Sequence, residues 1–236
     1  MSSLNRSDII RLYGEFNTPL CKQDCGKRCA PHNEGRHPFC CDTRHAVPTA
    51  YSAEWEYLKN ETDLWHLWQG ETHAETARLA GETPPGLTLI ECLGSDRCQR
   101  NYRSITCRAF PFFPYIDSRG EFLGMTYYHE YRDRCWIISH LDEVTPEFRK
   151  QFIRAYEYLF TCIPEEQGNF SAHSAEMRRV YSKSRRRIHL LHRDGKTYAI
   201  SPRSDMMEEI STQSLPRFGI YRLIAELPFP DESNDV

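Results

Sequence analysis

The chain has 236 residues, of which 39% are hydrophobic and 27% charged, and its formal net charge at pH 7 is -3. This balance is typical of a globular protein that buries its own core, and the slight negative charge does not favour bulk attraction to nucleic acid or to anionic membranes. The start of the sequence lacks the apolar run of a signal peptide, and no segment is apolar for the length that a bilayer span requires. We therefore expect a cytoplasmic protein with no membrane partner, whose thiols stay reduced.

The first half of the chain predicts two helices and a strand. Residues 51–70 have the composition of a helix, with Ser52 as its cap and Gly70 at its end. A second, short helix is expected over 71–81, and the run "LTLIEC" at 87–92 predicts a short strand.

The second half contains the clearest local signals. Residues 110–131 predict two extended segments around a turn at 117–120. Residues 146–163 predict a helix, because Thr145 is a favourable cap and apolar side chains recur at the helical period. A linker is expected over 165–176, and the Asp-Gly pair at 194–195, between two apolar runs, predicts a β-hairpin.

Together these segments predict an α+β fold with an irregular cysteine-rich metal-binding core, flanking helices and short antiparallel strands. We expect a cysteine-cluster domain over 1–165 and a C-terminal extension over 166–236, which carries a basic segment and the hairpin.

The ten cysteines are the most informative residues of the sequence. Five lie between residues 21 and 41, where large apolar side chains are scarce, and three more lie between 92 and 107. Metal sites are often built from groups of ligands on separate loops that meet in the fold. The sequence therefore predicts a metal centre with ligands from both groups, and the candidate ligands are Cys21, Cys25, Cys29, Cys40, Cys41, Cys92, Cys98, Cys107 and Cys135. Cys162, within the predicted helix, is expected to be a packing residue.

Spacing limits how these sulfur atoms can share an ion. On one continuous helix Cys21 and Cys29 would lie roughly 12 Å apart, so the segment must turn, and Gly26 offers a place to do so. Cys40 and Cys41 are adjacent, and in an extended chain they would point to opposite sides and serve different sites. The number of cysteines, with His32, His37 and His45 nearby, exceeds what one tetrahedral ion uses. Two sites or a polynuclear iron–sulfur centre fit this number better.

The pattern resembles a known family. "CKQDCGKRC", a Cys-Cys pair, "CLGSDRCQRNYRSITCRAFPF" and the later Cys135 are similar to the YkgJ-like cysteine-cluster family, described as zinc- or iron-chelating domains. The similarity covers roughly residues 15–140. The sequence departs from the family pattern in its first Cys-x3-Cys spacing and in a ten-residue insert after Cys29.

Thiolate ligands suit zinc or iron–sulfur clusters, and the spacing does not separate the two. The sequence thus predicts a zinc- or iron-binding protein. The alternatives are an iron–sulfur-dependent redox or methyl-transfer enzyme and a zinc-stabilised interaction module. No phosphate loop or catalytic triad is present to indicate another enzyme class.

Charged and aromatic residues around the cysteines predict less specific roles. Arginines near the cysteines would offset thiolate charge, or would simply be solvated, with Arg108 the expected exception beside Cys107. We expect the aromatic run at 110–115 to pack as a buried strand rather than line a pocket, and the pair His129 and Glu130 to be exposed rather than near a metal. The basic segment at 178–187 is expected to be a solvated helix face rather than a nucleic-acid site.

Overall fold

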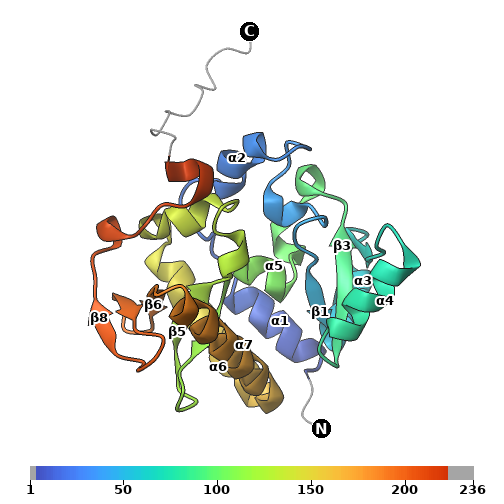
Figure 1. The fold of residues 1–236 in the computed structure, drawn as a ribbon. Helices are drawn as coiled ribbons and strands as arrows, with labels where there is room; N and C mark the ends of the chain where they lie inside the picture. Colours follow the sequence, from blue (N-terminus) through green and yellow to red (C-terminus); the bar gives the residue numbers. More distant parts are fainter. Residues whose placement is uncertain (1–3, 223–236) are drawn as a thin grey trace.

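The computed structural model describes residues 4–222, and residues 1–3 and 223–236 lie outside this range. The described chain combines helices with two antiparallel sheets, as the predicted α+β class requires (Figure 1). The helices are α1 (Arg6–Glu15), α2 (Cys25–Cys29), α3 (Ser52–Glu61), α4 (His73–Glu82), α5 (Ile105–Ala109), α6 (Pro146–Cys162) and α7 (Pro164–Lys183). The strands are β1 (Thr49–Tyr51), β2 (Trp65–Leu67), β3 (Leu87–Cys92), β4 (Phe112–Ile116), β5 (Phe122–Tyr127), β6 (Ile188–His192), β7 (Thr197–Ile200) and β8 (Met207–Glu209).

The smaller sheet has the strand order β1-β3-β2, and it places one candidate ligand directly. Its central strand β3 covers the predicted residues 87–92 and ends at Cys92, which pairs with Trp65 of β2. The Trp65 indole nitrogen donates to the carbonyl of Tyr102 at 2.7 Å. This bond ties the sheet to the loop that carries Cys98, so two parts of the second cysteine group are held together.

The larger sheet has the order β4-β5-β6-β7-β8, and both predicted hairpins lie in it. Successive side chains of β4 enter different buried clusters: Phe112 packs in the cluster that contains α6 residues, and Phe113 packs in the one that contains α7 residues. Burial on both faces explains why the sequence of this strand is continuously apolar instead of alternating. The prediction that residues 110–115 form a buried strand is confirmed for 112–115.

The helix predicted over 51–70 is too long. Helix α3 ends at Glu61, and residues 65–67 form β2 instead. Pairing with β3 and burial of Leu64 and Trp65 outweigh the helical composition of this segment.

The linker predicted over 165–176 is also wrong, because these residues belong to α7. Pro164 ends one helix and occupies the first turn of the next, a position that suits a residue without an amide hydrogen. The inward residues Phe170, Ser174, Met177 and Tyr181 follow the helical period. Helix α7 packs against β4, and β6 continues the sheet begun by β4 and β5, so elements on both sides of residue 165 contact one another.

The N-terminal cysteine segment has little apolar core of its own. Between residues 17 and 48 the buried residues are Cys21, Cys29 and Asn33. The segment is less irregular than predicted, because it contains α2 and two 3-10 turns, η1 (Ala30–His32) and η2 (Phe39–Cys41). Within residues 4–222, no helix is both long and apolar enough for a bilayer span.

His189 of β6 provides a test of the larger sheet that does not involve the cysteines. Burial lowers the pKa of His189 to about 4, and its ring lies 3.2 Å from the hydroxyl of Tyr127. The native state therefore keeps this ring neutral while the unfolded chain, with a pKa near 6.5, takes up a proton as the pH falls. Between pH 7 and pH 5 we expect the free energy of unfolding to fall by about 2 kcal/mol relative to that of a His189→Asn variant. Urea titrations at the two pH values measure this difference, and parallel pH dependence in the two proteins would contradict it.

Candidate metal centre

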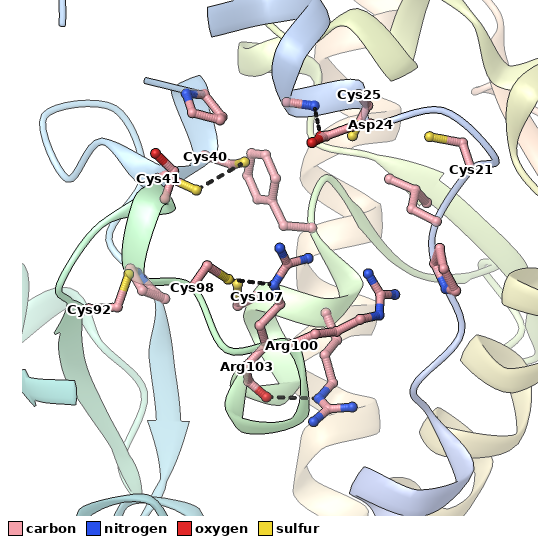
Figure 2. Close-up of a pocket in the computed structure, with 18 of the residues that line it drawn as sticks. Cys21, Asp24, Cys25, Cys40, Cys41, Cys92, Cys98, Arg100, Arg103 and Cys107 are labelled. Atoms are coloured by element: carbon pink, nitrogen blue, oxygen red, sulfur yellow. Dashed lines mark hydrogen bonds between the residues drawn. The ribbon is translucent and has the colours of Figure 1, made fainter. Parts of the chain in front are cut away.

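Seven of the nine candidate ligands line one cavity of about 430 Å³, which opens between α2, η2, the end of β3 and α5 (Figure 2). They come from four separate parts of the chain and are Cys21, Cys25, Cys40, Cys41, Cys92, Cys98 and Cys107. The remaining two, Cys29 and Cys135, do not line the cavity but lie close enough to Cys25 for their charges to affect its pKa. The cysteines at 21–41 and those at 92–107 are thus brought together by the fold.

The first sulfur group comprises Cys21, Cys25, Cys29, Cys40 and Cys135. Its geometry begins with Asp24, whose side chain accepts from the Gly26 amide at 3.0 Å and caps α2. The chain therefore turns before Cys25, whereas the sequence suggested a turn at Gly26, which lies inside the helix. The turn brings the thiols of Cys21 and Cys25 close enough for each to shift the pKa of the other, with that of Cys21 lowered and that of Cys25 raised.

Cys135 joins this group from a distant part of the chain. It directly precedes η6 (Trp136–Ser139), which packs against α2. Burial and then the neighbouring thiol of Cys29 raise the pKa of Cys135 to about 12. Burial likewise raises the pKa of Cys29 to about 11. At neutral pH, without a cation, these thiols are protonated.

The second sulfur group comprises Cys41, Cys92, Cys98 and Cys107. Cys107 lies in α5, where its amide receives a cap from the Ser104 hydroxyl at 3.2 Å. Burial raises the pKa of Cys107 to about 12, and the other three sulfur atoms add to the rise while Arg103 opposes it. Each member of the group thus lies within electrostatic reach of Cys107.

Cys40 and Cys41 connect the two groups. The 3-10 turn η2 places their sulfur atoms 4.0 Å apart, so the expectation of an extended pair pointing to opposite sides is not met. Their neighbours nevertheless differ. Cys40 interacts with Cys25 and Cys135 of the first group, and Cys41 lies within electrostatic reach of Cys92 and Cys107 of the second.

Arg103 contacts a sulfur atom directly. Its Nε donates to the Sγ of Cys98 at 3.0 Å, as Figure 2 shows. Although burial opposes it, the thiols of Cys107 and Cys98 raise the pKa of Arg103. Arg100 also lines the cavity, so the second sulfur group has two guanidinium groups that can offset thiolate charge.

Arg108, the arginine singled out from the sequence, is buried but has a different role. Its guanidinium donates to the carbonyls of Phe16 at 2.6 Å, Asn101 at 2.7 Å and Arg103 at 2.8 Å. It also lies 4.2 Å from the centre of the Tyr13 ring. Arg108 therefore fixes the backbone around the second sulfur group instead of binding a thiolate.

Glu54 stabilises the start of α5, the helix that carries Cys107. Its carboxylate accepts from the Tyr13 hydroxyl at 2.7 Å and from the Ile105 amide, the first of α5, at 2.6 Å. Burial raises the pKa of Glu54 to about 7, while these donors and Arg108 oppose the rise. No local pattern in the sequence predicts this role, because Glu54 is one of several acidic residues near a helix start.

The nearby histidines and Cys162 do not line the cysteine cavity. The ring of His45 lies 3.2 Å from the Asn33 side chain, and that of His37 lies 3.3 Å from the Ser95 hydroxyl. Cys162 packs at the end of α6 and lines neither of the two cavities.

The basic segment has internal partners. Arg178 donates to the carbonyl of Ile116 at 2.7 Å, Arg179 pairs with Glu176, and Arg187 pairs with Glu208. These contacts fit the expected solvated surface better than an open nucleic-acid site.

The sulfur atoms are gathered but do not form a closed coordination shell. In residues 4–222, no three histidine, cysteine, aspartate or glutamate side chains lie at the distances that a bound metal ion requires. The Cys40–Cys41 separation of 4.0 Å is nevertheless compatible with two sulfur atoms on one ion at bond lengths near 2.3 Å.

Comparisons with known proteins do not assign the chain. No family model matches it, and neither a curated protein nor a solved structure shows significant similarity. The resemblance to the YkgJ-like family remains a prediction from the sequence motifs.

The role of Arg108 predicts that lysine cannot replace it. A lysine ammonium is a point charge without the planar fork of donors, so Arg108→Lys leaves buried carbonyls unpaired. We expect a loss of at least about 2 kcal/mol in the free energy of unfolding, measured by urea titration. The exposed Arg78→Lys provides the matched control and should change this energy by less than about 0.5 kcal/mol. Equal effects of the two substitutions would show that Arg108 does not brace the fold.

Proposed function

We propose that this protein binds metal through two sets of cysteine thiolates, as zinc ions or as an iron–sulfur centre. The observation that carries the proposal is the gathering of nine of the ten cysteines, from residues 21 to 135, in and beside one cavity. The tenth, Cys162, lies apart on a helix end. A packing role alone would not collect thiols from so many segments around one space.

The chemistry of the donor set fits a metal. Closely spaced thiols, several of which raise one another's pKa, cannot all ionise together without a cation, and a bound metal ion replaces their protons. Four thiolates on a divalent ion leave excess negative charge, and Arg103 and Arg100 lie where they can offset it. The first group would hold its ion through Cys25, Cys29, Cys135 and Cys40 or Cys21. The second would use Cys41, Cys92, Cys98 and Cys107.

A second candidate is an enzyme that uses an iron–sulfur centre. The cavity of about 430 Å³ beside the sulfur atoms favours it, because a structural zinc site is closed and needs no such space. Protein purified without oxygen distinguishes the two: an iron–sulfur centre gives brown colour and visible absorption, whereas zinc gives colourless protein with about two equivalents of metal.

Substitution of single cysteines should show that the bound metal is divided between two sites. We expect Cys107→Ser and Cys29→Ser each to lose about half of the bound metal, because each removes a ligand from a different group. Cys162→Ser, the matched control, should keep the full content. Elemental analysis of the three purified variants measures this. Loss of metal from the Cys162 variant, or full retention in the other two, would contradict the proposed ligand sets.

Removal of metal should loosen the N-terminal segment first. Residues 17–48 bury two cysteines and one asparagine and little else, so ligation would supply most of their order. Helix α6 buries Phe148, Phe152 and Leu159 and should persist. We expect chelation to speed proteolytic cleavage within 20–45 by about tenfold or more, before α6 is lost, because cleavage follows local opening. Equally slow cleavage in fully demetallated protein would show that metal does not order this segment.

A further inference from the structure

A second cavity of about 360 Å³ lies beside the cysteine cavity, between β1, the segment around β4 and the start of α7. Cys40, Pro48, Cys107 and Phe110 line both cavities, so the two share a wall. A volume of this size accommodates a small organic molecule.

The charge of this cavity differs from that of its neighbour. Its described lining contains Glu166 and Glu130 but no lysine or arginine, whereas the cysteine cavity is lined by Lys22, Arg100 and Arg103 among others. A cation is therefore favoured in the second cavity and an anion is not.

Glu166 is the central group of the cavity. It lies in the first turn of α7, where the helix dipole favours a negative charge, and it is 6% exposed. Burial raises the pKa of Glu166, while the nearby side chains of Asn169 and Tyr51 oppose the rise. No described lysine, arginine or histidine forms an ion pair with it. A buried carboxylate is costly without a cationic partner, and this one faces a space that can hold one.

Aromatic side chains form the walls around this carboxylate. Tyr156 and Phe170 pack edge to face at 5.4 Å, and Phe110 contacts Tyr131 at 4.9 Å. Tyr51, Phe112 and Tyr128 complete the phenylalanine and tyrosine lining. Aromatic faces attract organic cations, and the attraction grows when water is excluded.

We propose that the second cavity binds an organic ammonium ion on a small apolar or aromatic body, with Glu166 as counter-ion and the tyrosine and phenylalanine rings as walls. Because Cys40 and Cys107 lie in the shared wall, the bound molecule contacts the sulfur region. The second cavity thus holds an organic cation, in addition to the metal proposed for the cysteine cavity.

Three probes that share a benzyl or phenyl body but differ in charge test this site: benzylammonium, benzyl alcohol and benzoate. In calorimetric titrations of the purified full-length protein at neutral pH, we expect benzylammonium to bind at least about tenfold more tightly than benzyl alcohol, and benzoate most weakly. Glu166→Gln should lower benzylammonium affinity about tenfold or more and leave benzyl alcohol affinity within about twofold. Retained benzyl alcohol binding shows that the cavity of the variant is intact.

Glu165→Gln is the matched control, because it removes the same charge from the adjacent, exposed residue of α7. It should leave all three affinities unchanged. If Glu166→Gln does not fold, Asn169→Lys at an exposed lining position places a cation beside the carboxylate and should abolish benzylammonium binding. Absence of benzylammonium binding, preference for benzoate, or equal effects of the two glutamate substitutions would overturn the proposal. The titrations do not depend on bound metal, so their result is separate from that of the metal analysis.

Discussion

The guanidinium of Arg108 is the interaction on which the cysteine region depends. It draws three backbone carbonyls together, one at the end of α1 and two in the loop before α5. Phe16 is far in sequence from Asn101 and Arg103, and its carbonyl would be unpaired in a buried environment without the arginine. Glu54 adds a second brace at the first amide of α5. Together Arg108 and Glu54 position Cys98 and Cys107, although neither side chain binds a sulfur atom.

The parts of the fold that sequence alone predicts are those with a local cause. Thr145 and Pro146 determine the start of α6 through capping and a missing amide hydrogen, and the Asp-Gly turn at 194–195 determines the hairpin of β6 and β7. The failures have distant causes. Trp65 is in a strand because β3 lies beside it, and Phe170 is in a helix because the sheet offers a surface for it to cover. Neither partner is visible within the local segment.

In the candidate site, too, sequence predicts the features with a local cause and misses those that depend on distant residues. Clustering of cysteines in the sequence selects eight of the nine thiols in and beside the cavity and sets Cys162 apart, whereas Cys135 is added by the resemblance to the cysteine-cluster family. Sequence does not reveal that Arg103, rather than Arg108, contacts a sulfur atom, because Arg108 is adjacent to Cys107 whereas Arg103 is several residues from either Cys98 or Cys107. Nor does it reveal the second cavity. Glu166 falls in a segment with the composition of a linker, and its burial follows only from the packing of α7.

The central claim is that thiolates supply the metal ligands, and X-ray absorption at the metal edge of the purified protein tests it most directly. The edge energy identifies the metal, and the fine structure gives the identity and distance of its neighbours. The account predicts a first shell of sulfur atoms alone, at about 2.3 Å for zinc. A first shell of nitrogen and oxygen, or protein that holds no metal after anaerobic purification, would contradict it.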